Sequence, residues 1–259
     1  MREGSFVAKN HGMKDKVKNY LMKSGWYVRR AKYVPAGIDW SHDLQRWIPK
    51  LKPNILFDIG ANVGQTCTEM HLNFPNAVIH SFEPIKETFV SLVNNTSSLP
   101  NISCHNCAMG SKSGNKSIKY TPHSVINSLK TGVHSKDPDA IEARINIKTV
   151  DEFCEDYGID KIDLLKTDTE GYDLEVLKGS STMLKANKIS AVLSEITFDE
   201  KNTLQTQFGE LNDYLSSFDF LVCCFYDTRT LMVLPKFGSF CNALWIKRDL
   251  LPLTHLVSY

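Results

Sequence analysis

The chain of 259 residues has little that would place it in a membrane or outside the cell. No stretch approaches the roughly 18 consecutive apolar residues that a membrane-spanning helix needs. Its first 19 residues are polar and charged, without the apolar core of a secretory signal. The sequence therefore predicts a cytoplasmic protein. It also has no internal repeat and no low-complexity segment, which argues against a solenoid or a disordered chain.

The chain has seven cysteines without regular spacing, and an odd number argues against a disulfide framework. Cys104 and Cys107 form one C-x-x-C pair, but no second pair follows at the spacing of zinc ligands. Both belong to an apolar run at residues 102–108. We therefore expect them to be core thiols rather than a redox or zinc site.

Positive and negative charges nearly balance, with a formal net charge of +1, but they are unevenly placed. Residues 1–50 hold 11 Lys or Arg and 4 Asp or Glu, a local charge of +7, which leaves −6 for the rest. A basic segment on an acidic body indicates contact with something anionic, such as a nucleotide sugar, a phospholipid carrier, a membrane surface or nucleic acid. A solvated helix with lysines on its outer face explains the same pattern, and both interpretations stay open.

Short apolar runs alternate with longer segments of helical spacing, and 42% of the residues are hydrophobic. The runs predict strands at residues 55–59, 78–82, 102–107, 162–166, 189–196, 220–225 and 242–246. Helices are expected at residues 64–74, 86–98, 173–185 and 203–217. Strands that alternate with helices build parallel βαβ units, and continuous apolar strands fit a sheet with helices on both faces. We therefore predict an α/β fold with a mostly parallel sheet, completed by an antiparallel hairpin of the last two strands.

Two segments interrupt this alternation. Residues 1–52 precede the first strand and are expected to form a basic, helical N-terminal extension, with the main domain at residues 53–259. Residues 111–149 are polar and rich in Ser, Lys and Asn, and they contain His123 and His134. A long insertion at the carboxyl ends of the strands often forms a substrate lid, and we expect one here.

Glycine is missing where a dinucleotide turn would need it. After the first predicted strand only Gly60 and Gly64 are present, and Asn62 stands where a pyrophosphate needs close backbone approach. A cofactor without a phosphate needs less clearance, so S-adenosylmethionine fits the turn better than NAD. Asp58 is placed to meet its ammonium group, directly or through water. Glu83, at the end of the second predicted strand, is placed to accept hydrogen bonds from a ribose diol.

Acidic side chains stand at or near the ends of four predicted strands: Asp58, Glu83, Asp168 and Glu195. Ligands of open α/β sheets bind outside the carboxyl ends of the strands, so we expect these side chains at one cleft. Glu170 follows Asp168 by two residues and can reach the same cleft from a turn. Two structural alternatives stay open, because Asp168 could cap the helix that follows it and Glu195 could be a solvated strand end.

The sequence resembles a known family in three motifs. Residues 57–64 and residues 81–84 look like the first two motifs of class I S-adenosylmethionine-dependent methyltransferases. Residues 158–179 are similar to the signature of the FkbM-type family. Thr167 and Thr169 depart from that signature, in which a branched apolar residue is commoner, and we draw no functional conclusion from them.

The resemblance covers residues 54–196 well and the C-terminal hairpin loosely, and it does not extend to residues 1–50. It implies a Rossmann-like fold with a seven-stranded sheet, and an O-methyltransferase that acts on a hydroxyl of a small molecule or sugar. It also implies that the methionine part of the cofactor is lined by Asp58, Gly60, Asn62 and Gly64, with Asp168 beside it. Ala61 and Val63, from the same motif, are further expected cofactor-binding residues. The same resemblance puts Glu83 on the ribose and places Asn106, Cys107 and Ala108 beside the adenine.

A sugar hydroxyl is a weak nucleophile at neutral pH, so a base or a metal should assist it. The candidate bases are Glu170, Glu195, His123 and His134. The cluster of Asp168, Glu170 and Glu195 could instead bind Mg²⁺ or Mn²⁺ through oxygen ligands. The expected acceptor is a small molecule or glycan, which could be anionic or carrier-linked, and formation of a homo-oligomer stays open.

Other functions also stay open. A nucleic-acid methyltransferase would use the basic N-terminal segment, in which Trp26, Tyr27, Tyr33 and Trp40 could stack on bases, but the acidic body argues against it. A non-catalytic protein that binds S-adenosylmethionine is an alternative from another class. A dinucleotide oxidoreductase is the weakest option, because the glycine pattern is incomplete.

Overall fold

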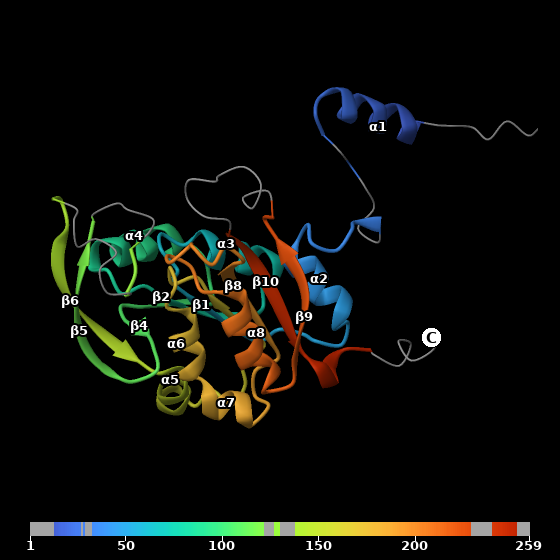
Figure 1. The fold of residues 1–259 in the computed structure, drawn as a ribbon. Coiled ribbons are helices and arrows are strands. Elements are labelled where there is room, and N and C mark those ends of the chain that lie inside the picture. The colour runs from blue at the N-terminus through green and yellow to red at the C-terminus, as the bar shows by residue number, and fades with distance from the viewer. Residues whose placement is uncertain are drawn as a thin grey trace, which may run out of the picture.

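A seven-stranded sheet forms the centre of the molecule, in the strand order β3-β2-β1-β7-β8-β10-β9 (Figure 1). The structure is a computed structural model, and it describes residues 13–26, 28, 33–121, 127–129, 138–228 and 240–252. The strands are β1 (Ile55–Ile59), β2 (Val78–Phe82), β3 (Ile102–His105), β7 (Leu164–Thr167), β8 (Ala191–Thr197), β9 (Phe220–Tyr226) and β10 (Phe240–Lys247). The five from β3 to β8 are parallel, and β10 runs antiparallel to both β8 and β9. The mostly parallel sheet and its C-terminal antiparallel hairpin are therefore confirmed.

Apolar side chains alternate between the two faces of this sheet. In β1, Leu56 packs on one face, whereas Phe57 and Ile59 pack on the other. The first face carries α2 (Trp40–Trp47), α3 (Gln65–Asn73) and α4 (Lys86–Thr96). The second face carries α5 (Val150–Tyr157), α6 (Asp173–Lys178), α7 (Ser181–Lys185) and α8 (Phe208–Ser216) (Figure 1). Because both faces are covered, the strands are apolar along their whole length.

Two strands form within the insertion at residues 111–149. β5 (Gly114–Tyr120) pairs antiparallel with β6 (Ile141–Lys148), which also pairs with the short β4 (Ala108–Met109). Alternate side chains of the two long strands are buried in a small apolar cluster, among them Ile118, Tyr120, Ile145 and Ile147. This period of two is a strand signal. The prediction gave more weight to polar composition and missed both strands.

Helix α2 packs into the core of the main domain. Trp40 and Leu44, together with Ile48 just after the helix, are buried in the same apolar cluster as one face of the sheet. The helix begins at a cap in which Asp39 Oδ1 accepts the backbone N–H groups of Ser41 (2.9 Å) and His42 (3.0 Å). The boundary expected at residue 52 therefore does not separate α2 from the domain.

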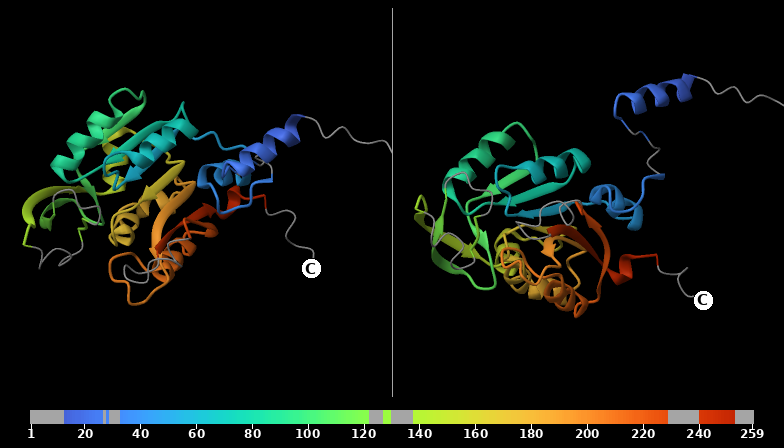
Figure 2. Two further views of the ribbon diagram at one scale, coloured as in Figure 1. Left: turned by 90° about the horizontal axis from the view of Figure 1, so that it is seen from above. Right: turned by 45° about the horizontal axis from the view of Figure 1, so that its top comes forward.

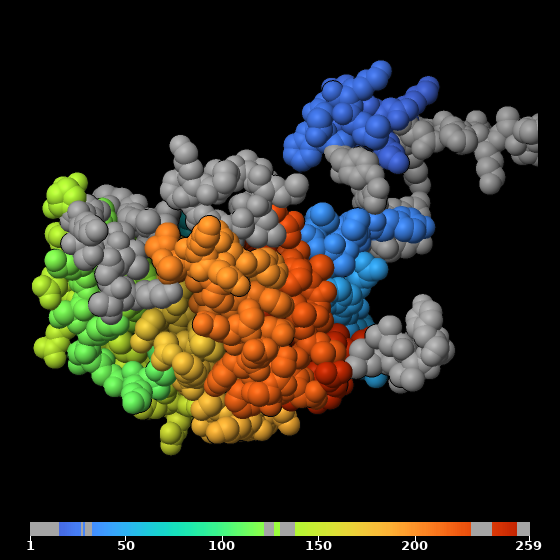
Figure 3. Space-filling model, in the orientation of Figure 1, coloured from blue at the N-terminus to red at the C-terminus, as the bar shows by residue number. Residues whose placement is uncertain are grey.

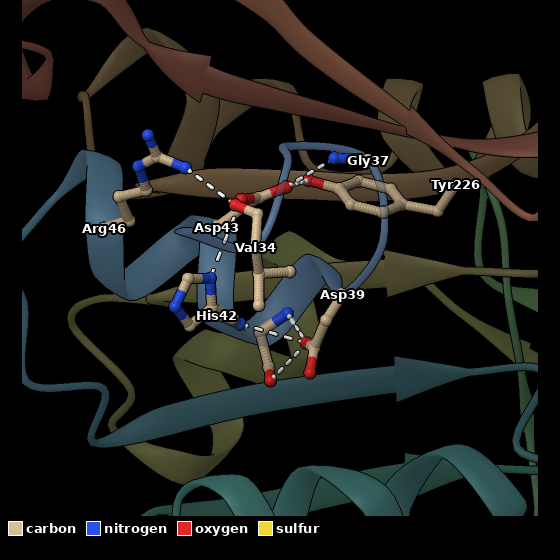
Figure 4. A network of polar contacts seen from close by, with 8 residues as sticks. Val34, Gly37, Asp39, His42, Asp43, Arg46 and Tyr226 are labelled. Carbon is tan, nitrogen blue, oxygen red and sulfur yellow. Dashed lines mark hydrogen bonds and ion pairs between the residues drawn. The ribbon is translucent and has the colours of Figure 1, made fainter. Parts of the chain in front are cut away.

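A buried carboxylate joins α2 to the far edge of the sheet, as Figure 4 shows. Asp43 Oδ2 accepts hydrogen bonds from the backbone N–H of Gly37 at 2.8 Å and from the hydroxyl of Tyr226 in β9 at 3.1 Å. Arg46, one turn further along α2, donates to the carbonyl of Val34 at 3.2 Å. These bonds fix the loop before α2 as well as the helix.

Helix α1 (Met13–Lys23) lies apart from the sheet and its helices in Figures 1 and 3 and in the right-hand view of Figure 2. Among the residues that the structure describes, no helix is both long enough and apolar enough to cross a membrane. All seven cysteines are free thiols. Cys107 is buried and Cys104 is half-buried, which fits the expectation of core thiols.

Candidate active site

The turn between β1 and α3 is held against the end of β2. The backbone N–H groups of Gly60 and Ala61 both donate to the carbonyl of Phe82, at 3.1 and 3.0 Å. Gly60, Asn62 and Gly64 have positive φ angles of 79°, 50° and 100°. This backbone conformation costs most side chains about 1–2 kcal/mol, and asparagine is one of the residues that tolerate it. The positive φ angles therefore explain why the turn has glycine at positions 60 and 64 and asparagine at position 62.

Glu83 follows β2 and fastens the turn through its carboxylate. Oε2 accepts the N–H of Asn62 at 3.1 Å, and Oε1 accepts the N–H of Ile85 at 2.9 Å. The side chain is 6% exposed, and its burial raises the pKa of the carboxyl to about 7. Each oxygen has a second lone pair, so Glu83 can still accept hydrogen bonds from a ligand.

The end of β7 approaches the same turn closely. The N–H of Asp168 donates to the carbonyl of Ile59 at 3.0 Å, which continues the pairing of β1 with β7. A Cβ atom added to Gly60 would lie 1.9 Å from the carbonyl oxygen of Asp168. Because no side chain fits there, glycine at this position allows Asp168 to reach the turn.

Three carboxylates meet near the carboxyl ends of β7 and β8. One carboxylate oxygen from each of Asp168, Glu170 and Glu195 lies within 4.8 Å of the others. Burial, followed by repulsion from Asp168 and Glu170, raises the pKa of Glu195 to about 9. Burial and repulsion from Asp168 raise the pKa of Glu170 to about 8. The cluster therefore favours a bound proton or a bound cation near neutral pH.

Both structural alternatives for these carboxylates are wrong. Helix α6 has Tyr172 at its N-cap, with no side-chain cap hydrogen bond, so Asp168 does not cap it. The neighbouring Asp173 instead accepts the N–H of Thr169 at 3.1 Å. Glu195 is buried in β8 and is not a solvated strand end. A helix cap thus does not account for Asp168, and a solvated strand end does not account for Glu195.

Lys166, in β7, supplies a buried positive charge. Its ammonium lies 3.1 Å from Oδ1 of Asp58 and 3.4 Å from Oδ2 of Asp168. Lys166 and Asp58 are direct neighbours in the register of β1 and β7, and both are buried. Burial alone would lower the pKa of Lys166, but attraction to the two carboxylates outweighs it and raises the pKa. Lys166 therefore stays charged and holds Asp168 in place.

A cavity of about 620 Å³ opens between these elements, a size typical of small-molecule sites. Its acidic lining residues are Glu83, Asp168, Glu170 and Glu195. Its apolar lining residues include Ile85, Ala108, Met109, Ile118 and Leu129. Ser128, from the insertion, also lines it and donates to the carbonyl of Glu170 at 2.6 Å. The cavity thus combines an acidic part with an apolar part.

The sequence matches the family model of the methyltransferase FkbM domain over residues 58–222. The chain belongs to the FkbM methyltransferase family. The matched range contains the glycine turn, Glu83 and the carboxylate cluster, and it confirms the resemblance seen in the motifs. The observed sheet, with its antiparallel C-terminal hairpin, is the Rossmann-like fold that this resemblance implies.

Three curated relatives show how far the similarity to other proteins extends. The hexuronic acid methyltransferase AglP of Haloferax volcanii is 30% identical over 146 residues, which cover 55% of this chain and 56% of AglP. Methyltransferase sdnD of Sordaria araneosa is 28% identical over 153 residues, or 48% of this chain and 59% of sdnD. The 31-O-demethyl-FK506 methyltransferase FkbM of Streptomyces tacrolimicus is 25% identical over 158 residues, or 50% of this chain and 61% of the relative. The chain therefore spans little more than half the length of the curated relatives it matches.

The FkbM-type motifs supply only part of the cavity lining. Of the residues predicted for the cofactor, those on the cavity are Gly60, Ala61, Asn62, Glu83, Ala108 and Asp168. The remaining ones, which do not line it, are Asp58, Val63, Gly64, Asn106 and Cys107. Asp58 is fully buried and paired with Lys166, and the Asn106 side chain donates to the backbone carbonyls of Glu83 and Pro84. His123 and His134 lie outside the described residues.

Several polar residues of the cavity were missed by the sequence interpretation, and Lys166 and Gln205 are the two that contact the carboxylates. Lys166 directly follows the apolar pair Leu164 and Leu165 in a predicted strand, and a lysine at such a position is a signal that could have been used. Gln205 lines the cavity and donates from Nε2 to Oε2 of Glu170 at 3.1 Å. No spacing in the sequence connects Gln205 with Glu170, because the contact joins two separate loops.

Proposed function

We propose that this protein is an S-adenosylmethionine-dependent O-methyltransferase that methylates a hydroxyl of a small molecule or sugar. The observation that carries the proposal is the cavity, where the glycine turn, Glu83 and the three clustered carboxylates face one space. Membership of the FkbM family supports methyl transfer. The names of two relatives, a hexuronic acid methyltransferase and a 31-O-demethyl-FK506 methyltransferase, support a sugar or small-molecule acceptor.

The lining residues fit S-adenosylmethionine better than a dinucleotide. Asn62 lines the cavity in the turn where a pyrophosphate would need close approach to bare backbone. Glu83 can accept hydrogen bonds from a ribose diol at the tip of β2. Ala108 and Met109 offer an apolar surface to the adenine, and the carboxylates suit a positively charged methionine part.

S-adenosylmethionine supplies a methyl group on a sulfonium sulfur. The new O–C bond forms as the C–S bond breaks, and the bonding pair stays on the sulfur, so no general acid is needed. The residues of the cavity have to orient the acceptor hydroxyl, exclude water and remove the hydroxyl proton. Asp168, Glu170 and Glu195 can remove it in two ways, as a general base or through a bound cation.

The insertion at residues 111–149 is assigned to the acceptor side of the cavity. Ile118 and residues 127–129 line the cavity, although they are far in sequence from the turn and the carboxylates. The hydrogen bond from the Ser128 hydroxyl to the carbonyl of Glu170 connects the insertion to the carboxylate cluster. These contacts support the idea of a substrate lid.

Glu83→Ala is expected to weaken S-adenosylmethionine binding by about 1–3 kcal/mol, because buried hydroxyl or N–H groups lose their acceptor. Isothermal titration calorimetry measures the change. Glu210→Ala is the matched control, because Glu210 is an exposed residue of α8 away from the cavity. Equal affinities of Glu83→Ala and the native protein would refute the ribose role of Glu83.

An acceptor panel tests the proposed reaction itself. The purified chain is incubated with methyl-labelled S-adenosylmethionine and with neutral sugars, hexuronic acids, polyketide alcohols or RNA in separate reactions. We expect label in a sugar or small-molecule fraction, and mass spectrometry should place the new methyl on oxygen. Transfer to RNA alone, or to nitrogen or carbon alone, would contradict the proposal.

A further inference from the structure

Glu195 presents a buried carboxylate oxygen without a partner. The side chain is only 9% exposed, and its Oε2 makes no hydrogen bond among the residues that the structure describes. A buried carboxylate is costly unless it is protonated, paired or bound to a metal. Glu195 also belongs to the carboxylate cluster, in which one oxygen from each of Asp168, Glu170 and Glu195 lies within 4.8 Å of the other two.

The other two carboxylates are each held by one oxygen. Asp168 pairs through Oδ2 with Lys166 at 3.4 Å, and Glu170 accepts through Oε2 from Gln205 at 3.1 Å. Their second oxygens have no hydrogen bond or ion pair with a described residue. All three side chains are therefore fixed by protein contacts or burial, and each keeps an oxygen for a ligand.

Positive charge is scarce around this point. Lys166 is the only Lys, Arg or His among the described residues that line the cavity, and its ammonium also pairs with the buried Asp58. Asp173, from α6, adds a further buried carboxylate, which is hydrogen-bonded to the N–H of Thr169 and the hydroxyl of Thr206. One ammonium cannot balance so many carboxylates, which makes the cluster attractive to a cation.

We propose that Asp168, Glu170 and Glu195 bind one divalent cation, Mg²⁺ or Mn²⁺. Three carboxylate oxygens suit these hard cations, whereas protein zinc sites are built mainly from cysteine and histidine. Three protein ligands leave coordination positions open to an acceptor oxygen. The cation would make a hydroxyl bound there more acidic, so that its proton leaves to solvent. This last role rests on the proposed methyl transfer, but the cation site itself does not.

Mn²⁺ binding to the full chain tests the site without cofactor or acceptor. Electron paramagnetic resonance of free Mn²⁺ during a titration gives the number of bound ions and their affinity. We expect one bound Mn²⁺ per chain, which excess Mg²⁺ should displace. Glu195→Gln should bind Mn²⁺ at least about tenfold more weakly, because the site loses one charged ligand. Glu210→Gln, on the exposed face of α8, is expected to bind like the native chain.

Folding of the variants is checked by thermal denaturation. Glu195→Gln removes an unpaired buried carboxylate, so we expect it to be at least as stable as the native chain. Failure of the folded native chain to bind Mn²⁺, or equal binding by native protein and Glu195→Gln, would overturn the cation site. Methyl transfer that persists unchanged in EDTA would overturn its role and leave the proposed function standing. If the chain binds Mn²⁺ but does not bind S-adenosylmethionine, the cation site is supported and the proposed methyltransferase function is refuted.

Discussion

Gly60→Ala is expected to lower the free energy of unfolding by about 3–5 kcal/mol. Alanine is strained in the left-handed backbone conformation of this residue, and its Cβ would overlap a neighbouring main-chain atom. The φ angle of Gly60 is +79°, and an added Cβ would lie 1.9 Å from the carbonyl oxygen of Asp168. Gly60 and Asp168 directly follow the paired strands β1 and β7, and Asp168 donates its N–H to the carbonyl of Ile59. The two segments therefore cannot move apart without disturbing the β1–β7 register. Urea unfolding followed by circular dichroism measures the loss.

Gly209→Ala provides the matched control for this substitution. Gly209 lies in α8, and a Cβ there would meet no atom within 4 Å. Alanine is the better helix former, so we expect this variant to be more stable by up to about 1 kcal/mol. A loss below about 1 kcal/mol in Gly60→Ala, comparable with ordinary surface substitutions, would show that the close approach of Asp168 is not a constraint.

Lys166→Met should destabilise the protein by about 3–5 kcal/mol, the usual cost of removing one partner of a buried ion pair. The substitution leaves Asp58 fully buried without its ammonium partner at 3.1 Å. A buried carboxyl without a partner takes up a proton, so the loss should shrink as the pH falls. Unfolding experiments at two pH values, one neutral and one acidic, measure both effects.

Lys178→Met is the control for Lys166→Met. Lys178 pairs with Glu175 at 2.6 Å, but its side chain is 44% exposed, and exposed pairs contribute at most about 1 kcal/mol. We expect a small change in its unfolding free energy. Similar losses for Lys166→Met and Lys178→Met would contradict the view that the Lys166–Asp58 pair is a buried structural element of the site.

Much of the sheet could be predicted because its strands are buried on both faces. Each apolar run from residues 55–59 to 242–246 became a strand, with boundaries that differ by two residues or fewer. The helix expected at residues 173–185 is divided into α6 and α7. The division falls at Gly179, where a Cβ would lie 2.0 Å from the carbonyl oxygen of Gly110. Such a close contact between distant segments leaves no periodic signal in the sequence.

Local signals that were present at the insertion were not used. Thr149 Oγ1 accepts the N–H of Glu152 at 3.0 Å and caps α5, which the sequence T-x-x-E indicates. The alternation of β5 and β6 was equally visible. Both features were overlooked because residues 111–149 are polar overall.

Strand ends could be located from the sequence, but strand register could not. The order of apolar runs placed Glu83, Asp168 and Glu195 at one edge of the sheet, and all three line the cavity. The register of β1 against β7 decides that Lys166 lies beside Asp58. It also decides that Asp58 faces this lysine and does not line the cavity.

Calorimetric titration of S-adenosylmethionine into the native chain decides whether the cavity is a cofactor site. We expect saturable binding of one cofactor per chain. Binding is expected to be about 5- to 150-fold weaker in Glu83→Ala, which is about 1–3 kcal/mol. No saturable binding by the folded native chain would show that the cavity does not hold S-adenosylmethionine.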